Sequence, residues 1–281
     1  MAFKRMVKAL AAEIGLGRVD TVVIHDRPTQ DMQGRLAVIT GGTSGIGLEI
    51  GKRFCASGCR VALLGTNAEK GGRAVDEITE TYPMSDARYF FCDVSNPDSA
   101  RTAIEEVSNA FSGEAVGILV NSAGKNCTER FPEVTPQVFD EVMAVNLKGV
   151  LFMSQIVARK MIDQNTKGNI LNISSMSSYR PAPSPYEVSK WGLRGLTIGM
   201  ADELIKHGIV VNSIAPGPTA TPMLGLERGA DLKLGWNPSG RMADAREIAE
   251  LAAMLVSDVG RLIVGDTVCA GGGGGVLSLQ R

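Results

Sequence analysis

The sequence predicts an α/β fold in which one doubly wound parallel sheet carries helices on both faces. From Arg35 onward, short apolar runs rich in β-branched residues alternate with longer segments of helical periodicity. The short runs lack the polar alternation of a half-exposed strand, which is typical of parallel strands covered on both sides. In such a fold the crossovers are right-handed, and ligands bind beyond the carboxyl ends of the strands.

Seven strands and three long crossover helices are expected in order along the chain. Each expected strand ends near a turn signal, and each helix is long enough to return the chain to the sheet for a parallel pairing. The strands are expected at Leu36–Thr40, Arg60–Leu64, Arg88–Cys92, Gly117–Asn121, Asn169–Ser174, Val210–Ile214 and Thr267–Ala270. The helices are expected at Asp98–Phe111, Pro136–Ile162 and Tyr186–Lys206.

Two regions are expected, an N-terminal extension of residues 1–33 and one large domain of residues 34–281. In the extension, apolar residues at helical spacing predict a short amphipathic helix that packs on its own domain or on a neighbouring subunit. These apolar residues are Phe3, Met6, Val7, Leu10 and Ile14. The glycine run Gly271–Gly275 follows the last expected strand and is expected to be a terminal coil.

Composition excludes several classes of protein. The formal net charge is -1 over 281 residues, without a dense basic run, so no nucleic-acid partner is expected. The two histidines, His25 and His207, lie far apart and lack ligand-spaced partners, so no metal site is expected. Five scattered cysteines indicate reduced thiols and a cytoplasmic location. We expect no membrane partner and no apolar run that approaches the ~20 residues of a membrane span.

A glycine-rich turn joins the first expected strand to a helical segment. Glycines there permit unusual backbone angles and let main-chain N–H groups approach a pyrophosphate, while the helix N-terminus adds a partial positive charge. Glycines also end strands for steric reasons, but this position between strand and helix favours nucleotide binding. The expected nucleotide-binding residues of the turn are Gly41, Thr43, Ser44, Gly45, Ile46 and Gly47.

Tyr186 and Lys190 are the candidate proton-transfer pair. Four residues apart at the start of a helix, they project from the same face. A phenol loses its proton near pH ~10, which is too high for acid–base work at neutrality. A neighbouring ammonium group and a positively charged cofactor ring would favour the phenolate and lower the pKa of Tyr186. The alternative is an ordinary helical Tyr/Lys pair that arose by chance.

The spacing T-G-x-x-x-G-x-G from Thr40 to Gly47 resembles the short-chain dehydrogenase/reductase family, and the resemblance extends from about Arg35 to about Gly272. It implies a Rossmann-type fold and an NAD(P)-dependent oxidoreductase. By resemblance, Asp93 and Val94 contact the adenine, and Tyr186 and Lys190 also contact the cofactor. The residues implied to line the cofactor cleft are Asn121, Ala123 and Gly124. Those implied to hold the nicotinamide carboxamide are Pro216, Gly217, Thr219 and Thr221.

The resemblance also implies a catalytic set of Asn146, Ser175, Tyr186 and Lys190. Tyr186 exchanges a proton with the substrate oxygen as hydride moves between NAD(P)(H) and a ketone or secondary alcohol. Ser175 stabilises the developing oxyanion, and Lys190 and Asn146 support a proton relay through water. The interval from Ser175 to Tyr186 is shorter than the family's usual loop, so Ser174 and Ser177 remain alternatives.

Cofactor choice depends on the end of the second strand. No acidic residue is present there, which favours NADP over NAD, although Thr66 replaces the arginine common in NADP-dependent relatives. Thr66, Asn67 and Lys70 could accommodate the phosphate.

Substrate identity is less evident. A lid over residues 222–240 is implied by the resemblance, and its apolar Met223, Leu224 and Leu226 suggest a partly hydrophobic small-molecule substrate. Lys125, Asn126, Met176 and Pro183 are candidates for the other walls. Relatives pair their long helices, so a homo-dimer or homo-tetramer is expected.

Two other functions remain possible on this fold. An epimerase or dehydratase that retains its NAD would need a larger C-terminal substrate domain than the chain offers. A non-catalytic dinucleotide sensor or scaffold would commonly lack the tyrosine or the lysine, and both are present as Tyr186 and Lys190.

Overall fold

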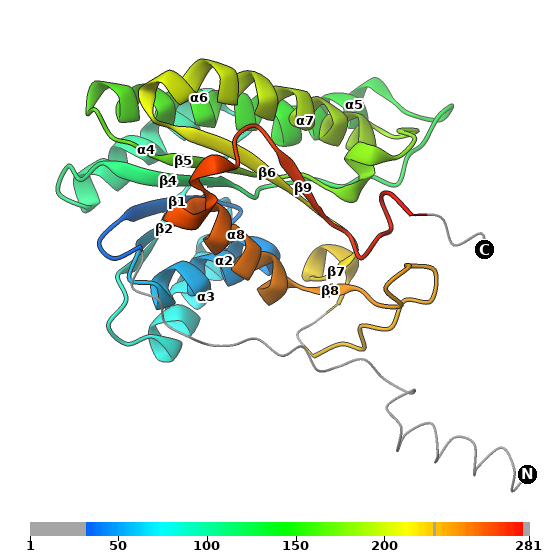
Figure 1. Cartoon of the computed structure of the whole chain (residues 1–281), viewed down its shortest axis with the longest axis horizontal. Coiled ribbons are helices and arrows are strands. Elements are labelled where there is room, and N and C mark those ends of the chain that lie inside the picture. The colour runs from blue at the N-terminus through cyan, green and yellow to red at the C-terminus, as the bar shows by residue number, and fades with distance from the viewer. Residues whose placement is uncertain (1–31, 227–228, 278–281) are drawn as a thin grey trace, which may run out of the picture.

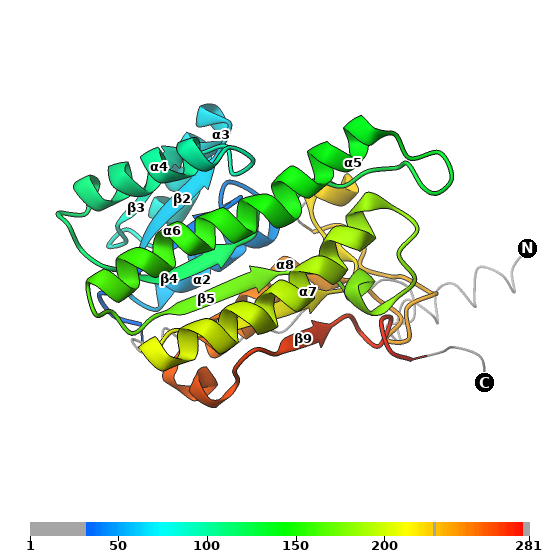
Figure 2. The same cartoon turned by 90° about the horizontal axis from the view of Figure 1, so that it is seen from above.

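The computed structural model of the chain describes residues 32–226 and 229–277. A seven-stranded parallel sheet lies between two layers of helices (Figures 1 and 2), in the strand order β3-β2-β1-β4-β5-β6-β9. The strands are β1 (Leu36–Thr40), β2 (Arg60–Gly65), β3 (Ala87–Phe91), β4 (Val116–Asn121), β5 (Asn169–Ile173), β6 (Val210–Pro216) and β9 (Thr267–Ala270). The doubly wound α/β class is confirmed, and each expected strand is present with its ends shifted by at most two residues.

Helices cover both faces of the sheet. The helices are α2 (Gly45–Ala56), α3 (Ala68–Thr81), α4 (Pro97–Ala110), α5 (Pro136–Met143), α6 (Gly149–Asp163), α7 (Pro185–Leu204) and α8 (Ala245–Val256). In Figure 1, α2, α3 and α8 lie below the sheet and the others above it. Side chains of β1 alternate between two apolar cores: Ala37 and Ile39 pack toward α2 and α8, whereas Leu36 and Val38 pack toward α4 and α6.

The switch in winding direction occurs at β1. From β1 the chain proceeds to β2 and β3 on one side, then returns to place β4 on the other, so that Thr40 pairs with both Leu64 and Asn121. Connections leaving β1 and β4 therefore diverge and open a crevice at the carboxyl edge of the sheet, which is where open α/β sheets bind ligands.

The expected helix Pro136–Ile162 is not continuous. A single π-helical turn, Ala144–Lys148, separates α5 from α6, and such turns frequently mark functional sites. The combined stretch Pro136–Asp163 is long and apolar enough to cross a membrane, with a mean hydropathy of 1.3. The expectation that no apolar run approaches that length is therefore wrong. Because 44% of its most apolar 18-residue segment is buried within the fold, this stretch is weak evidence for a membrane span.

The segment between β6 and α8 forms an arm beside the sheet. It leaves through β7 (Thr219–Ala220) and returns through β8 (Ala243–Asp244), and these two short strands pair in parallel. The lid expected at 222–240 is the connection between them, described except for residues 227–228. An amphipathic helix is expected within residues 1–33, but the structure does not describe residues 1–31, so this expectation lies outside the described residues.

Candidate active site

The glycine-rich turn leaves a bare backbone surface at the crevice. Gly41 and Gly45 have φ of 62° and 55°, which non-glycine residues rarely adopt. A Cβ atom on Gly41 would lie 2.8 Å from the Cα of Ala123, and one on Gly47 would overlap the carbonyl oxygen of Gly41. Ser44, the N-cap of α2, makes no side-chain capping bond, so the N–H groups of the first turn are available for an anion. This geometry fits a nucleotide pyrophosphate.

Threonine and asparagine side chains tie the strand ends together behind the turn. The Oγ1 atom of Thr40 accepts hydrogen bonds from the N–H groups of Ser122 (3.1 Å) and Ala123 (3.2 Å). Asn121 is buried and donates to Ser154 Oγ and to Asn172 Oδ1, both at 2.9 Å. Asn121 therefore fixes the sheet, while the backbone after it forms the wall of the crevice.

A cleft of about 340 Å³ opens at this edge of the sheet. Its lining includes many of the residues expected to bind the cofactor: Gly41, Ser44, Gly45, Ile46, Gly47, Ala123, Gly124, Tyr186, Lys190, Pro216, Gly217, Thr219 and Thr221. Ser175 and Met176 line it as well, as do Asn126 from the β4 side and Met223 and Leu224 from the lid. Lys125, Pro183 and Leu226, also expected to line the substrate pocket, are not part of the lining.

The expected adenine-side residues lie outside this cleft, at the ends of β2 and β3. Thr66 is exposed, and the Asn67 side chain caps α3 by accepting from the Lys70 N–H at 2.8 Å. Asp93 accepts from the Ser95 N–H at 2.9 Å and thereby shapes its own loop. A Cβ on Gly65 would lie 3.0 Å from Thr43 Cγ2, so the end of β2 packs closely on the glycine-rich turn.

Ser175 faces Tyr186 across the cleft. Both side chains line the cleft, and hydrogen bonding by Ser175 acts to lower the pKa of Tyr186. The Ser175 Oγ also accepts from the Ser177 N–H at 3.1 Å. The two alternatives do not have this geometry: the Ser174 hydroxyl donates to the Lys190 carbonyl at 3.4 Å, and Ser177 contributes its backbone. The structure therefore brings Ser175 to the tyrosine despite the short loop between them.

Burial dominates the electrostatics of Tyr186 and Lys190. Burial raises the pKa of Tyr186, the Ser175 hydrogen bond opposes this, and Glu187 adds to the rise. Burial also lowers the pKa of Lys190 from 10.5 to about 8. The Lys190 ammonium donates to the Ile173 carbonyl at 2.9 Å and lies 5.6 Å from the Tyr186 ring centroid. In the protein alone, burial outweighs the other contributions. The expected lowering of the Tyr186 pKa also requires the positive nicotinamide ring of a bound nucleotide, and it stays a prediction.

Asn146 lies in the π-helical turn and is fully buried. Its Oδ1 accepts from the Lys125 N–H at 2.7 Å, and its amide donates to the Lys125 carbonyl at 2.9 Å and to Ser189 Oγ at 3.0 Å. The Cβ position of Gly124 is 3.7 Å from Asn146 Oδ1 and 4.0 Å from the Lys190 ammonium nitrogen. The missing side chain of Gly124 thus leaves a polar gap between these two groups.

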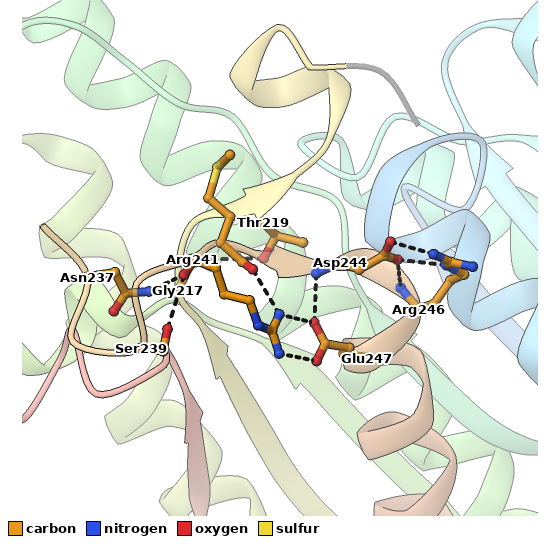
Figure 3. A network of polar contacts seen from close by, with 9 residues as sticks. Gly217, Thr219, Asn237, Ser239, Arg241, Asp244, Arg246 and Glu247 are labelled. Atoms are coloured by element: carbon orange, nitrogen blue, oxygen red, sulfur yellow. Dashed lines mark hydrogen bonds and ion pairs between the residues drawn. The ribbon is translucent and has the colours of Figure 1, made fainter. Parts of the chain in front are cut away.

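A polar network that the sequence analysis missed holds the returning arm of the lid (Figure 3). Arg241 makes two hydrogen bonds of 2.7 Å to the Glu247 carboxylate, and Asp244 and Glu247 form a capping box at the start of α8. The Ala243 N–H donates to the Pro218 carbonyl at 2.8 Å, which connects the network to the cleft wall. The D-x-x-E spacing of Asp244 and Glu247 before an apolar run was the available signal.

Among the residues that the structure describes, His, Cys, Asp and Glu side chains form no group of three that could hold a metal ion. The cleft instead combines a bare anion cradle with a serine–tyrosine pair and a buried lysine. This combination defines a nucleotide-dependent enzyme that exchanges a proton with its substrate.

Comparison with known proteins gives the family. A model of the short chain dehydrogenase family matches residues 35–230, so the chain belongs to that family. The 3alpha-hydroxysteroid dehydrogenase of Mediterraneibacter gnavus is 33% identical over 245 residues, covering 86% of this chain and 97% of the relative. The (3R)-3-hydroxyacyl-CoA dehydrogenase of Mus musculus is 34% identical over 254 residues, covering 86% and 96%.

A solved structure agrees with this assignment. The short-chain type dehydrogenase/reductase from Mycobacterium marinum superposes with a TM-score of 0.80 at 29% identity, covering 89% of this chain and 98% of its own. The protein is therefore an oxidoreductase that moves a hydride between a nicotinamide nucleotide and the CH–OH or C=O group of a small molecule.

Proposed function

We propose that the chain is an NADP-preferring enzyme that interconverts a partly hydrophobic ketone and its secondary alcohol, with Tyr186 as the acid–base group. The observation that carries this proposal is that Ser175, Tyr186 and the glycine-rich turn line one cleft. Lys190, buried in the same cleft, completes the set.

The bound nucleotide supplies or accepts the hydride. Because burial raises the pKa of Tyr186, its hydroxyl holds the proton at neutral pH and can donate it to a carbonyl oxygen. The Ser175 hydroxyl stabilises the negative charge that develops on the same oxygen. In alcohol oxidation Tyr186 must first lose its proton, and the positive charge of Lys190 favours that loss.

Proton supply to Tyr186 is proposed to run past Gly124. Asn146 Oδ1 and the Lys190 ammonium lie on either side of the gap left by the absent side chain, at 3.7 and 4.0 Å from the Gly124 Cβ position. A water molecule there would connect the two groups, since both are polar and the gap is of atomic size. The π-helical turn around Asn146 supports this role.

Preference for NADP over NAD is inferred from the end of β2. Gly65 occupies the position where an acidic side chain would repel a 2′-phosphate, and Thr66 and Lys70 are exposed beside it. Asp93 and Asn67 hold the neighbouring backbone by accepting hydrogen bonds from the N–H groups of Ser95 and Lys70. NAD remains the second candidate, because position 66 carries a threonine and not an arginine that would pair with the phosphate.

The substrate is proposed to be apolar around its carbonyl group. The cleft beyond Ser175 and Tyr186 is walled by Met176, Met223 and Leu224, and apolar walls with a few convergent polar groups are typical of small-molecule sites. A hydroxysteroid and a hydroxyacyl thioester are the substrates named for two relatives, and both combine a reacting C–O group with apolar surface.

The protein is also proposed to form a homo-dimer or homo-tetramer in the cytoplasm, with neither nucleic acid nor membrane as a partner. An apolar hollow between α5–α6 and α7, lined by Met143, Leu147, Leu151 and Leu196, supports pairing of these helices. The near-neutral net charge supports the absence of a nucleic-acid partner, and the scattered cysteines support a cytoplasmic location. Light scattering of the full chain tests the assembly, and a monomer at micromolar concentration would contradict it.

Steady-state kinetics tests the proposed reaction. Wild-type protein is assayed with NADPH and with NADH against a panel of cyclic and acyclic ketones, and with the oxidised nucleotides against the matching alcohols. The proposal predicts turnover that is faster with NADPH and greatest for ketones with apolar substituents. Nucleotide binding without turnover of any carbonyl or alcohol would favour a sensor instead.

A further inference from the structure

The glycine run Gly271–Gly275, expected to be a terminal coil, is folded against the active site. Its backbone turns back on itself, with the Gly274 N–H donating to the Gly271 carbonyl at 3.0 Å. The Ser239 N–H of the lid's returning arm donates to the Gly272 carbonyl at 3.0 Å. The run therefore lies between the lid and the end of the sheet. It has no helix or strand, as expected of a coil, but it is packed in place.

The five glycines are required for two different reasons. Gly272 and Gly273 have φ of 60° and 86°, so their backbone needs glycine. Gly271, Gly274 and Gly275 lack such angles, but a side chain there would press on its neighbours at 3.2–3.3 Å. A Cβ on any of these three would approach Met176, at 3.3 Å from its Cβ for Gly271 and Gly275 and at 3.2 Å from its Sδ for Gly274.

Met176 directly follows Ser175 and separates the glycine run from the cleft. The Met176 side chain is 5% exposed and lines the cleft beside Ser175 and Tyr186. The glycine run packs on it but does not line the cleft. The position of the methionine is therefore set from behind by glycines that lie almost a hundred residues further along the chain.

Neighbours of Gly274 determine which way an added side chain would push. A Cβ there would lie 3.2 Å from both Asn237 Oδ1 and Met176 Sδ. Asn237 is held, because its amide donates to the Arg241 carbonyl at 2.7 Å (Figure 3) and its side chain is 3% exposed. Methionine is flexible and unbranched, so it yields first. Since the run blocks its other side, Met176 would move into the cleft.

We propose that Met176 sets the size limit of the substrate side of the cleft, and that Gly271, Gly274 and Gly275 set how far Met176 reaches into it. This inference rests on the proposed function, and it assigns specificity to residues outside the catalytic set. Smaller side chains at position 176 admit bulkier carbonyl compounds, and larger side chains in the run exclude them.

Kinetics of the full chain with cyclohexanone and with the two-ring ketone decalone test the proposal. Gly274→Ala is expected to raise the KM for decalone roughly tenfold, the effect of about one methyl group in a close-fitting pocket, and to change the KM for cyclohexanone less than about twofold. Gly72→Ala is the control, because a Cβ on Gly72 meets nothing within 4 Å. Nucleotide affinity is expected to be unchanged in both variants.

Met176→Ala provides the second arm. The single variant Met176→Ala is expected to lower the KM for decalone. In the double variant, Gly274→Ala is expected to lose its effect on that KM, because the effects of substitutions at contacting residues are not additive. The proposal is overturned if Gly274→Ala acts equally on both ketones, weakens nucleotide binding, or keeps its full effect in the Met176→Ala background. Failure of the wild type to reduce either ketone would contradict the proposed function itself.

Discussion

The two halves of the cleft are built in different ways. The nucleotide half consists of backbone from the turns that follow the neighbouring strands β1 and β4. Its shape depends on glycines such as Gly41 and Gly47, where an added Cβ would collide with main chain. The substrate half consists of side chains, Met176, Met223 and Leu224, from segments far apart in the sequence. Rigid backbone suits a ligand that never changes, whereas side chains on loops let substrate preference vary on the same scaffold.

The largest effect is expected where the two halves meet. Tyr186→Phe removes the phenol hydroxyl from the cleft that Ser175 and Lys190 also line. Turnover is therefore expected to fall by about 100-fold or more, as loss of a positioned acid–base group produces. Nucleotide affinity is expected to persist, which fluorescence titration of the same sample checks. Turnover near the wild-type rate would exclude Tyr186 as the proton donor.

The nucleotide half is tested by Gly47→Ala. Its Cβ would overlap the Gly41 carbonyl oxygen, so the turn must shift. We expect a loss of about 1–3 kcal/mol in unfolding free energy and weakened nucleotide binding. Chemical denaturation and nucleotide titration measure the two effects. Gly72→Ala is again the matched control, and wild-type behaviour of Gly47→Ala would show that the cradle is not as tight as the structure indicates.

Lys190 makes stability depend on pH. Burial lowers its pKa from 10.5 to about 8, so between these values the folded chain binds fewer protons than the unfolded chain. The unfolding free energy therefore rises with pH across this window, by at most about 1.4 kcal/mol per pH unit. Urea denaturation between pH 8 and 10 should show a steeper rise for wild type than for Lys190→Met. Equal slopes would mean that Lys190 is ionised and solvated in the folded state.

The smallest effect is expected in the arm behind the substrate half. Arg241→Met removes the paired hydrogen bonds to Glu247, and because both side chains are about a third exposed the loss of stability should be about 1 kcal/mol or less. The KM for a ketone should rise, since the Ala243–Pro218 hydrogen bond ties this arm to the cleft wall. Arg241→Lys should recover part of the loss. A wild-type KM in Arg241→Met would show that the arm does not position the lid.

Much of the nucleotide half could be predicted from the sequence, because each feature there has a local backbone cause. The glycine spacing from Thr40 to Gly47 and the strand ends at Asn121 and Pro216 are requirements of turn geometry that neighbouring residues reveal. Ser175, Tyr186 and Lys190 could also be placed, since they lie at the end of a strand and on one face of a helix.

Long-range contacts account for what the sequence did not reveal. The glycine run looks like a coil until its packing on Met176 is seen, and the Arg241–Glu247 pair needs the arm to fold back on α8. Burial, which raises the pKa of Tyr186 in the protein alone, is likewise a property that local spacing does not report. The π-helical turn at Asn146 likewise interrupts a pattern that reads as one continuous helix.

Titration of the purified chain with NADPH and NADH, followed by nicotinamide fluorescence, tests the central claim most directly. Wild-type protein should bind NADPH more tightly than NADH. Gly47→Ala should bind NADPH more weakly than wild type does, and Tyr186→Phe should bind it as tightly as wild type does. Binding of neither nucleotide by folded wild-type protein would contradict the account, because the cleft would then lack the hydride carrier on which every assigned role depends.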